Sequence, residues 1–314
     1  MTIKEIYNLA IQKGISADFR DKKEIEKQLT KLKEKYQKME EEEKKEFDLE
    51  RLENPFSDTR ILFDEPEKEV KKILAGIDID GGELLLAEKI GGVDLVISHH
   101  PRGKALAGLD DVMQLQIDIL AKYGVPVNIA EKLLQKRIEE VARGLAPVNH
   151  NRVVDMARLL KIPLMCIHTP ADNLVAKFVD EKIKKDEPET IGEIIKSLKE
   201  ISEYQEAVKI GAGPKIFVGK EESRCGKIVL TEITGGTEGA PSMYEKLAQA
   251  GAGTIISMHQ SEEHRKEAEA ANLNVIVSGH ISSDSIGLNL FLDELERKGI
   301  KIVPCSGLIR ISRV

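Results

Sequence analysis

Two adjacent histidines, His99 and His100, follow an apolar run and are followed by Pro101. Proline disfavours helical backbone at His100, so we expect the pair in an extended conformation, with the two imidazoles on opposite sides. Imidazole is a frequent ligand of divalent metals, whereas packing makes little use of two adjacent imidazoles. The dipeptide therefore predicts metal binding, with each ring available to a different ion.

Further carboxylate and imidazole side chains stand at comparable positions later in the chain. Asp172 lies four residues after His168, and His280 lies four residues before Asp284. That spacing lets His280 and Asp284 reach one site. Asp172 could instead cap the helix that follows it, and Asp284 could be an acid favoured near a helix N-terminus. The predicted metal ligands are His99, His100, Asp172, His280 and Asp284.

Two other residues near these positions have less direct predicted roles. His168 also ends an apolar run, and we expect it to contact a ligand or to orient its loop rather than to bind metal directly. Arg102 could hold a phosphate or carboxylate, although ordinary surface charge is the simpler interpretation. Residues 234–239, Thr-Gly-Gly-Thr-Glu-Gly, form either a phosphate-binding turn or only a tight connection.

The elements that must position these side chains alternate between strands and helices from about residue 70 onward. The strands read as short continuous apolar runs, which is typical of strands buried on both faces. The alternation predicts an α/β fold of two lobes, with largely parallel or mixed sheets covered by helices. In such sheets, ligands bind beyond the carboxyl ends of the strands. We expect strands at residues 72–78, 93–98, 163–168, 227–234, 253–258, 274–278 and 301–304, and helices at 110–123, 130–144, 151–160, 173–185, 242–251 and 262–271.

Residues 21–53 differ from the rest because charged side chains dominate and the apolar ones recur at heptad-like spacing. The pattern predicts an amphipathic helix, ended by Pro55, that packs on its own domain or on a sister subunit. The alternative is a dedicated partner-binding module. We therefore expect an N-terminal helical segment at residues 1–55, a first lobe at 56–190, a connecting segment at 191–226 and a second lobe at 227–314.

Composition restricts the class of protein. The 314 residues have a formal net charge of −7, no tryptophan and 4% aromatic residues, which disfavours nucleic acid as a partner. No apolar run is long enough to span a bilayer and no signal peptide is visible, so we expect a cytoplasmic protein. Three scattered cysteines predict neither a disulfide nor a thiolate zinc site.

In combination, the segments DLVISHHP, HTPADN and GHISSD resemble motifs of the NIF-three-like family, also labelled type 2 GTP cyclohydrolase I. The resemblance covers roughly residues 55–314. It implies a dinuclear metal centre between two α/β lobes, a toroidal homohexamer and ligand roles for the five residues predicted above. Asp284 stands where the family usually has glutamate. His259 stands where the family more often has the glutamate of Thr-Gly-Glu, so it is expected to be an additional ligand or a group facing the substrate.

The ligand set indicates the chemistry. Three neutral imidazoles and two carboxylates carry a charge of −2 against +4 from two divalent ions, which favours a small anionic substrate. Nitrogen and oxygen ligands without thiolate suit zinc, manganese, iron, cobalt or nickel. We expect a metal-dependent hydrolase of a nucleotide, phosphoester or cyclic amide that uses a metal-bridging hydroxide. The alternative is a non-catalytic metal-binding or interaction scaffold that assembles as a ring. The cyclohydrolase label rests on the resemblance alone, and no catalytic residue is assigned.

Overall fold

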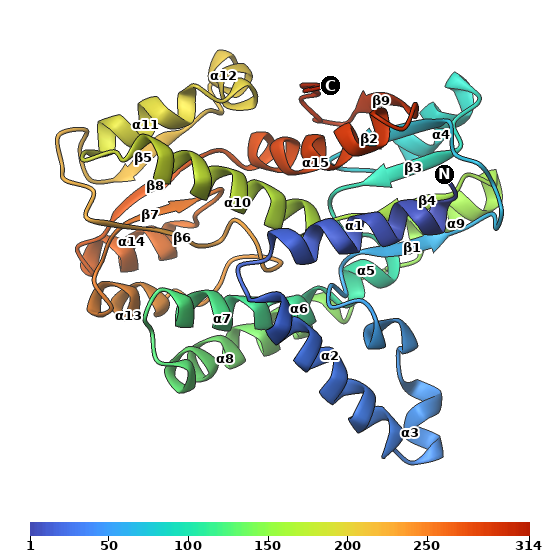
Figure 1. The fold of residues 1–314 in the computed structure, drawn as a ribbon, viewed down its shortest axis with the longest axis horizontal. Coiled ribbons are helices and arrows are strands. Elements are labelled where there is room, and N and C mark those ends of the chain that lie inside the picture. Colours follow the sequence, from blue (N-terminus) through green and yellow to red (C-terminus); the bar gives the residue numbers. More distant parts are fainter.

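The computed structural model describes residues 1–314. Two sheets lie side by side, the first at the right and the second at the left of Figure 1. Their strand orders are β1-β4-β3-β2-β9 and β5-β8-β7-β6. All pairings are parallel except those of β1 and β5, which are antiparallel strands at the sheet edges. The strands are β1 (Arg60–Phe63), β2 (Lys72–Gly76), β3 (Leu95–Ser98), β4 (Leu164–Cys166), β5 (Lys215–Val218), β6 (Lys227–Leu230), β7 (Ala252–Ser257), β8 (Asn274–Val277) and β9 (Lys301–Cys305).

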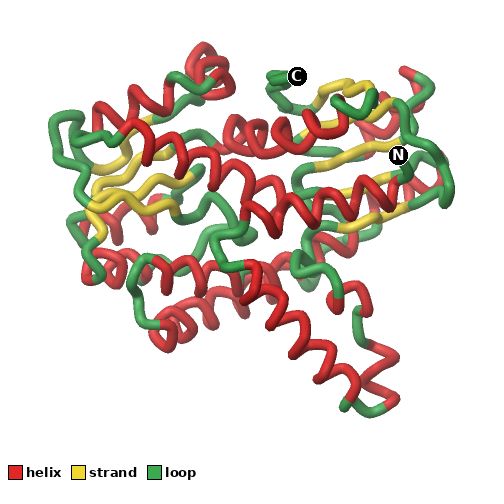
Figure 2. The backbone as a smooth tube through the Cα atoms, viewed as in Figure 1, coloured by secondary structure: helices red, strands yellow, loops and turns green.

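Helices cover both sheets, as the tube in Figure 2 shows, which confirms the predicted α/β class. None of them has the length and apolar composition needed to cross a membrane. The helix expected at residues 110–123 is divided at Met113 into α6 and α7. The helices are α1 (Ile3–Ala17), α2 (Lys22–Gln37), α3 (Glu41–Glu46), the 3-10 helix η1 (Leu49–Leu52), α4 (Gly81–Ile90), α5 (Gly103–Ala107), α6 (Leu109–Val112), α7 (Gln114–Lys122), α8 (Val127–Leu145), α9 (Arg152–Leu160), α10 (Thr169–Asp186), α11 (Ile191–Lys199), α12 (Ser202–Lys209), α13 (Met243–Gln249), α14 (Glu262–Ala270) and α15 (His280–Glu296).

Strand membership differs from the expected lobes in two places. β5 lies within the expected connecting segment but pairs with β8 in the second sheet. β9 lies within the expected second lobe but pairs with β2 in the first sheet. The reason for the second difference is the apolar face of α15. Four of its residues are buried with Ile300 in a core of the first sheet, so the chain returns there: Leu288, Phe291, Leu292 and Leu295.

Helices α10 and α15 pack against each other and lie across the middle of the molecule in Figure 1. Each helix contributes side chains to an apolar core of the first sheet and to one of the second sheet. On α10, Ala171 packs in the core of the first sheet, whereas Val175 and Val179 pack in that of the second. On α15, Ile286 belongs to the core of the second sheet and Leu288 to that of the first. The two helices therefore join the two sheets.

Residues 21–53 form α2, α3 and η1 instead of one helix. In Figure 1 α2 and α3 project from the lower right of the molecule. Ile25 is the one fully buried side chain of α2, at 1% exposed. The later members of the apolar stripe, such as Leu32 and Tyr36, are only half-buried. The segment is thus attached to the body at its base.

Candidate metal centre

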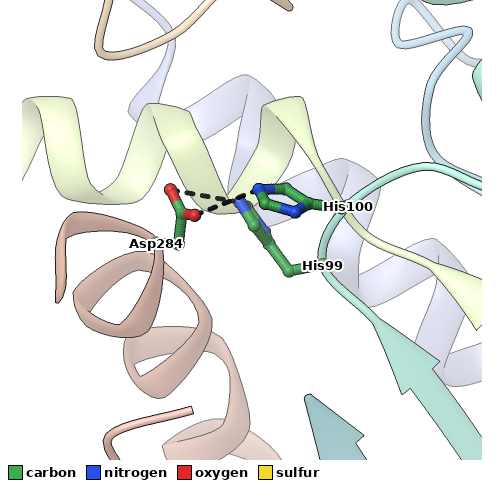
Figure 3. Close-up of side chains that lie close together, drawn as sticks. All are labelled: His99, His100 and Asp284. Carbon is green, nitrogen blue, oxygen red and sulfur yellow. Dashed lines mark ion pairs between the residues drawn. The ribbon is translucent and has the colours of Figure 1, made fainter. Parts of the chain in front are cut away.

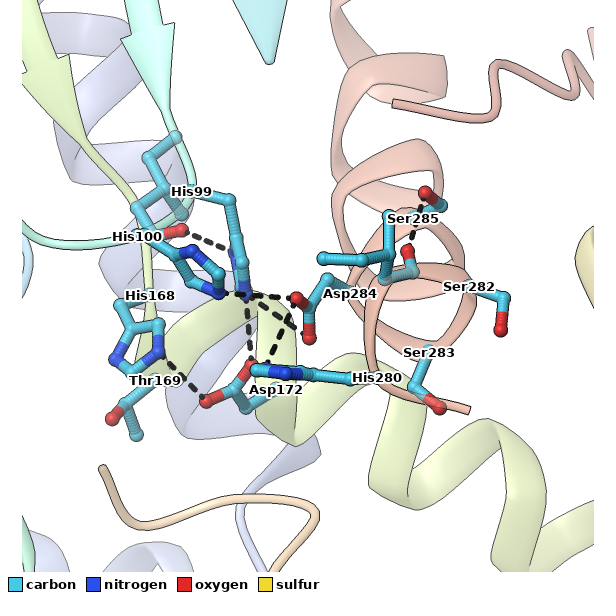
Figure 4. Close-up of polar contacts among 12 residues, drawn as sticks. His99, His100, His168, Thr169, Asp172, His280, Ser282, Ser283, Asp284 and Ser285 are labelled. Atoms are coloured by element: carbon cyan, nitrogen blue, oxygen red, sulfur yellow. Dashed lines mark hydrogen bonds and ion pairs between the residues drawn. The ribbon is translucent and has the colours of Figure 1, made fainter. Parts of the chain in front are cut away.

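The five predicted ligands come from three places that the fold brings together. His99 and His100 directly follow β3, and their backbone amides donate to the carbonyls of Gly76 and Ile77 at the end of β2. Asp172 lies in the first turn of α10, and His280 and Asp284 lie in the first turns of α15. Figure 4 shows these side chains facing one another between β3 and the two helices.

The carboxylate of Asp284 faces both adjacent histidines (Figure 3). Its Oδ1 is 3.5 Å from His99 Nε2, and its Oδ2 is 3.2 Å from His100 Nε2. The two rings have centroids 5.3 Å apart and both turn toward this carboxylate. They converge, therefore, instead of pointing to opposite sides as expected. One ligand atom from each of the three residues lies within 4.8 Å of the others, so the group could hold a metal ion.

A second group of three shares His99 with the first. His99 Nε2 is 3.4 Å from Asp172 Oδ1, and His168 Nε2 is 3.7 Å from Asp172 Oδ2. These three residues are buried, and their ligand atoms also lie within 4.8 Å of one another. The geometry therefore places His168 among the direct ligand candidates, whereas the sequence indicated a supporting role. The N-cap interpretation of Asp172 does not apply, because α10 begins at Thr169.

His280 and His259 lie beside these groups. His280 Nε2 is 3.5 Å from Asp284 Oδ2, and its ring centroid is 5.3 Å from that of His100. Burial lowers the pKa of His280, and the neighbouring imidazoles of His259 and His100 lower it further, although Asp284 acts in the opposite direction. The ring centroids of His259 and His280 are 5.1 Å apart, and His259 Nδ1 is 3.6 Å from Glu238 Oε1.

Three imidazoles are oriented by a hydrogen bond on Nδ1. His99 Nδ1 is 3.0 Å from the carbonyl oxygen of Ile167, His100 Nδ1 is 2.8 Å from Asp78, and His168 Nδ1 is 2.8 Å from Asp58. Each ring therefore presents Nε2 to the site, as metal-binding imidazoles commonly do. Neither Asp58 nor Asp78 was expected from the sequence. Each reaches its histidine only through the tertiary fold.

Asp78 also explains the position of the Arg102 side chain. The Arg102 guanidinium donates from Nε to the carbonyl oxygen of Ile79 at 2.7 Å and lies 3.6 Å from Asp78. Its side chain is thus tied to the loop that orients His100. The Arg102 side chain is 25% exposed, and its use for an anionic group stays a prediction.

Several buried polar atoms at the centre of the site have no hydrogen-bond partner. They are His99 Nε2, Asp172 Oδ1 and both carboxylate oxygens of Asp284. An unsatisfied buried polar atom costs roughly 1–3 kcal/mol, more when it is charged, so such atoms rarely gather without a reason. All four atoms are ligand atoms of the groups described above. The donor set therefore fits divalent metal ions.

Opposite charges hold these side chains in ionised forms. Burial disfavours the charged form of His99, but the carboxylates of Asp284 and Asp172 outweigh burial and raise its pKa well above the usual range. Burial likewise opposes ionisation of Asp284, yet His99 and His100 lower the pKa of this carboxyl. In the metal-free protein, the proton on His99 thus supplies part of the positive charge that a metal cation would place beside these carboxylates.

The arrangement can be compared with known proteins. No protein-family model matches the sequence, and no curated protein matches it significantly. The structure is similar to the crystal structure of a NIF3 superfamily protein from Sphaerobacter thermophilus, with a TM-score of 0.76 and 24% identity over 98% of this chain and 99% of that one. The fold is that of the NIF3 superfamily.

The NIF3 fold was expected from the three motifs, and the structural likeness confirms it at the level of the fold. A more distant likeness is to reduced HcgD from Methanocaldococcus jannaschii, with a TM-score of 0.50 and 17% identity over 78% of this chain and 87% of that one. The Sphaerobacter protein is matched over almost its whole length, so the projecting segment at residues 21–53 falls within a shared architecture.

Proposed function

We propose that this chain binds two divalent metal ions and uses them to hydrolyse a small anionic substrate. The observation that carries the proposal is the pair of three-residue groups that share His99, with their unsatisfied buried ligand atoms. His99 has only Nε2 free for a metal, so it can bind only one of the two ions. One ion would be held by His100, His280 and Asp284. The other would be held by His99, His168 and Asp172. The ions suited to this mixture of nitrogen and oxygen ligands are zinc, manganese, iron, cobalt or nickel.

The residues of the chain have separable roles in such a centre. Asp284 contacts both adjacent histidines, so it is the natural bridging carboxylate. Asp58 and Asp78 fix the orientation of His168 and His100 and increase their basicity. When bound, two such ions lower the pKa of a coordinated water and polarise an oxygen of the substrate. His280, 42% exposed at its side chain, lies on the side that a substrate can reach.

Elemental analysis of the purified protein tests the metal part of the proposal. We expect close to two transition-metal ions per chain after reconstitution with zinc or manganese and removal of free metal. The loaded protein is then assayed against nucleotides, generic phosphoesters and cyclic amides. Turnover that disappears in His100→Ala supports hydrolysis. A wild-type chain that cannot be loaded with either metal contradicts the proposal.

A non-catalytic scaffold is the second candidate function, and the projection of α2 and α3 from the body favours it. A projecting helical segment attached through Ile25 is suited to contact another subunit or protein. Assembly as a homohexameric ring is proposed from the family resemblance. Two tightly bound ions without turnover on the substrate panel would favour the scaffold over the hydrolase.

A further inference from the structure

A small cavity adjoins the candidate metal centre on the side of the second sheet. Its lining includes the ligand candidate Asp172 and, beyond the end of β6 and β7, Glu232, Thr234, Gly236, Thr237 and His259. Its volume is about 10 Å³, which is room for one water-sized group. Of the predicted metal ligands, only Asp172 lines this cavity. The loop at residues 234–239 supplies three of its seven lining residues.

The loop is held by a buried glutamine of α7. The side-chain amide of Gln116 donates to the carbonyl oxygens of Gly235 and Thr237, at 2.8 and 2.6 Å. A trans peptide holds its N–H opposite its C=O. The amides of Gly236 and Glu238 are therefore turned away from Gln116, and neither donates a hydrogen bond within the chain.

The backbone of this loop has the conformation that such an orientation requires. Gly235 and Gly236 have φ values of 92° and 94°, which side chains other than glycine rarely adopt. A Cβ at Gly236 would also approach Val112 to 2.9 Å. Consecutive amides exposed by left-handed residues form concavities that bind anions.

Two glutamate carboxylates lie near the loop, and each already has a hydrogen-bond donor and a histidine as partners. Glu232 accepts hydrogen bonds from the Gly239 amide and from the Tyr244 hydroxyl, and it lies 3.1 Å from His264. Glu238 accepts from the Ser261 amide and lies beside His259. Both carboxylates are thus engaged with groups other than the free amides. The hydroxyl of Thr234 donates to Asn173, next to Asp172, and fixes the loop against α10.

We propose that this cavity is an oxyanion subsite, in which the amide of Gly236 receives one negatively charged oxygen of a substrate bound at the metal pair. The inference rests on the proposed function and narrows its substrate class. A cavity of this size admits a single oxygen and excludes a whole phosphate or sugar. The substrate is therefore one whose reacting group carries a charged oxygen beside the metals, either a phosphoryl group or the tetrahedral form of an acyl group.

Inorganic phosphate and acetate are suitable probes, since the first resembles a phosphoryl group and the second an acyl product. Their affinities for the metal-loaded protein are measured by calorimetry, for the wild type and for Gln116→Glu. The variant replaces the donating amide by a carboxylate that repels the two carbonyls, so the loop amides lose their orientation. We expect the tighter-binding probe to bind at least tenfold more weakly to the variant, the loss expected when a charged oxygen loses a hydrogen-bond donor. The probe that shows this loss identifies the reacting group.

Gln135→Glu is the matched control, because Gln135 is exposed on α8 and the charge change is the same. It should leave both affinities unchanged. Equal affinities in Gln116→Glu and wild type, with metal content retained, overturn the proposal. A crystal structure of the wild type with phosphate gives a test that needs no variant. One phosphate oxygen should lie within hydrogen-bond distance of the Gly236 amide, and a phosphate with no oxygen in the cavity also overturns the proposal.

Metal content is measured in every sample, which separates the two proposals. A wild-type chain without metal contradicts the metal-dependent hydrolase. The phosphate position in crystals of that same chain still decides whether the cavity binds an oxyanion.

Discussion

The carbonyl oxygen of Ala171 on α10 lies so close to Gly287 on α15 that a Cβ at Gly287 would approach it to 2.2 Å. Ala171 directly precedes Asp172, and Gly287 lies three residues after Asp284. The close contact of the two helix backbones thus occurs beside the two carboxylates of the candidate metal centre. Any larger residue at position 287 must separate the helices.

Gly287→Ala should therefore lower the number of metal ions bound per chain. It should also reduce the free energy of unfolding by roughly 1–3 kcal/mol, since overpacking forces backbone shifts. Elemental analysis and denaturant unfolding measure the two effects. Gly144→Ala is the control, because Gly144 lies in α8 with nothing near its Cβ position. That control should be neutral or slightly stabilising, and unchanged metal content in Gly287→Ala would contradict the role given to the close contact.

His99 has only Nε2 free for a metal, because its Nδ1 is hydrogen-bonded to the carbonyl oxygen of Ile167. His99→Ala should therefore cost one ion and leave about one ion per chain, the one held by His100, His280 and Asp284. His168→Ala affects the same ion and should also leave about one. His150→Ala, outside both groups, should retain two. Elemental analysis measures these outcomes, and two ions in His99→Ala would contradict its role as a ligand.

If the proposed metal ions bind, their removal should destabilise the fold, because they would bind the folded chain and satisfy its buried polar atoms. With free metal at 100 times its dissociation constant, the stabilisation is about 2.7 kcal/mol for one site. Thermal unfolding is compared with and without a chelator. A double variant, Asp172→Asn with Asp284→Asn, should show no chelator effect. If the wild-type protein unfolds at the same midpoint temperature with and without the chelator, this result would count against bound metal.

His264 should make stability depend on pH. Burial opposes its charged form, but Glu232 at 3.1 Å outweighs burial and raises the pKa of His264. A raised folded pKa gives stability that is fully present below the unfolded value of about 6.5 and is lost as the pH rises through the folded pKa. The difference in unfolding free energy between wild type and His264→Gln should thus be largest near pH 6 and smaller at pH 9. Denaturant unfolding at several pH values measures it, with His150→Gln as control. A difference that grows with pH would refute this account.

Most of the fold could be predicted because its inner strands, such as β2, β3 and β4, are buried apolar runs. All seven strands expected from apolar runs are present. β1 and β5 were not predicted from their periodicity. Each is an antiparallel edge strand of four residues, and the alternating exposure of β5 lacks a continuous apolar run. Edge strands depend on pairing with a neighbour, which local sequence does not encode.

The candidate site could be predicted for those of its residues that lie at the end of a strand. His99, His100 and His280 stand at such ends, and the rule for ligands at carboxyl ends of parallel strands brings them together. Asp58 and Asp78 could not be predicted in this way. Asp58 lies 110 residues from His168 in the chain, and only the pairing of β1 with β4 makes them neighbours. Orientation of a ligand by a distant residue leaves no local signal.

The return of β9 to the first sheet also has a consequence for the order of assembly during translation. β9 leaves the ribosome after the other eight strands, yet it completes the edge of β2, which is made more than 200 residues earlier. His280 and Asp284 emerge only shortly before it. The first sheet must therefore wait with β2 unpaired on that side, and the candidate metal centre can be complete only after α15 has been made.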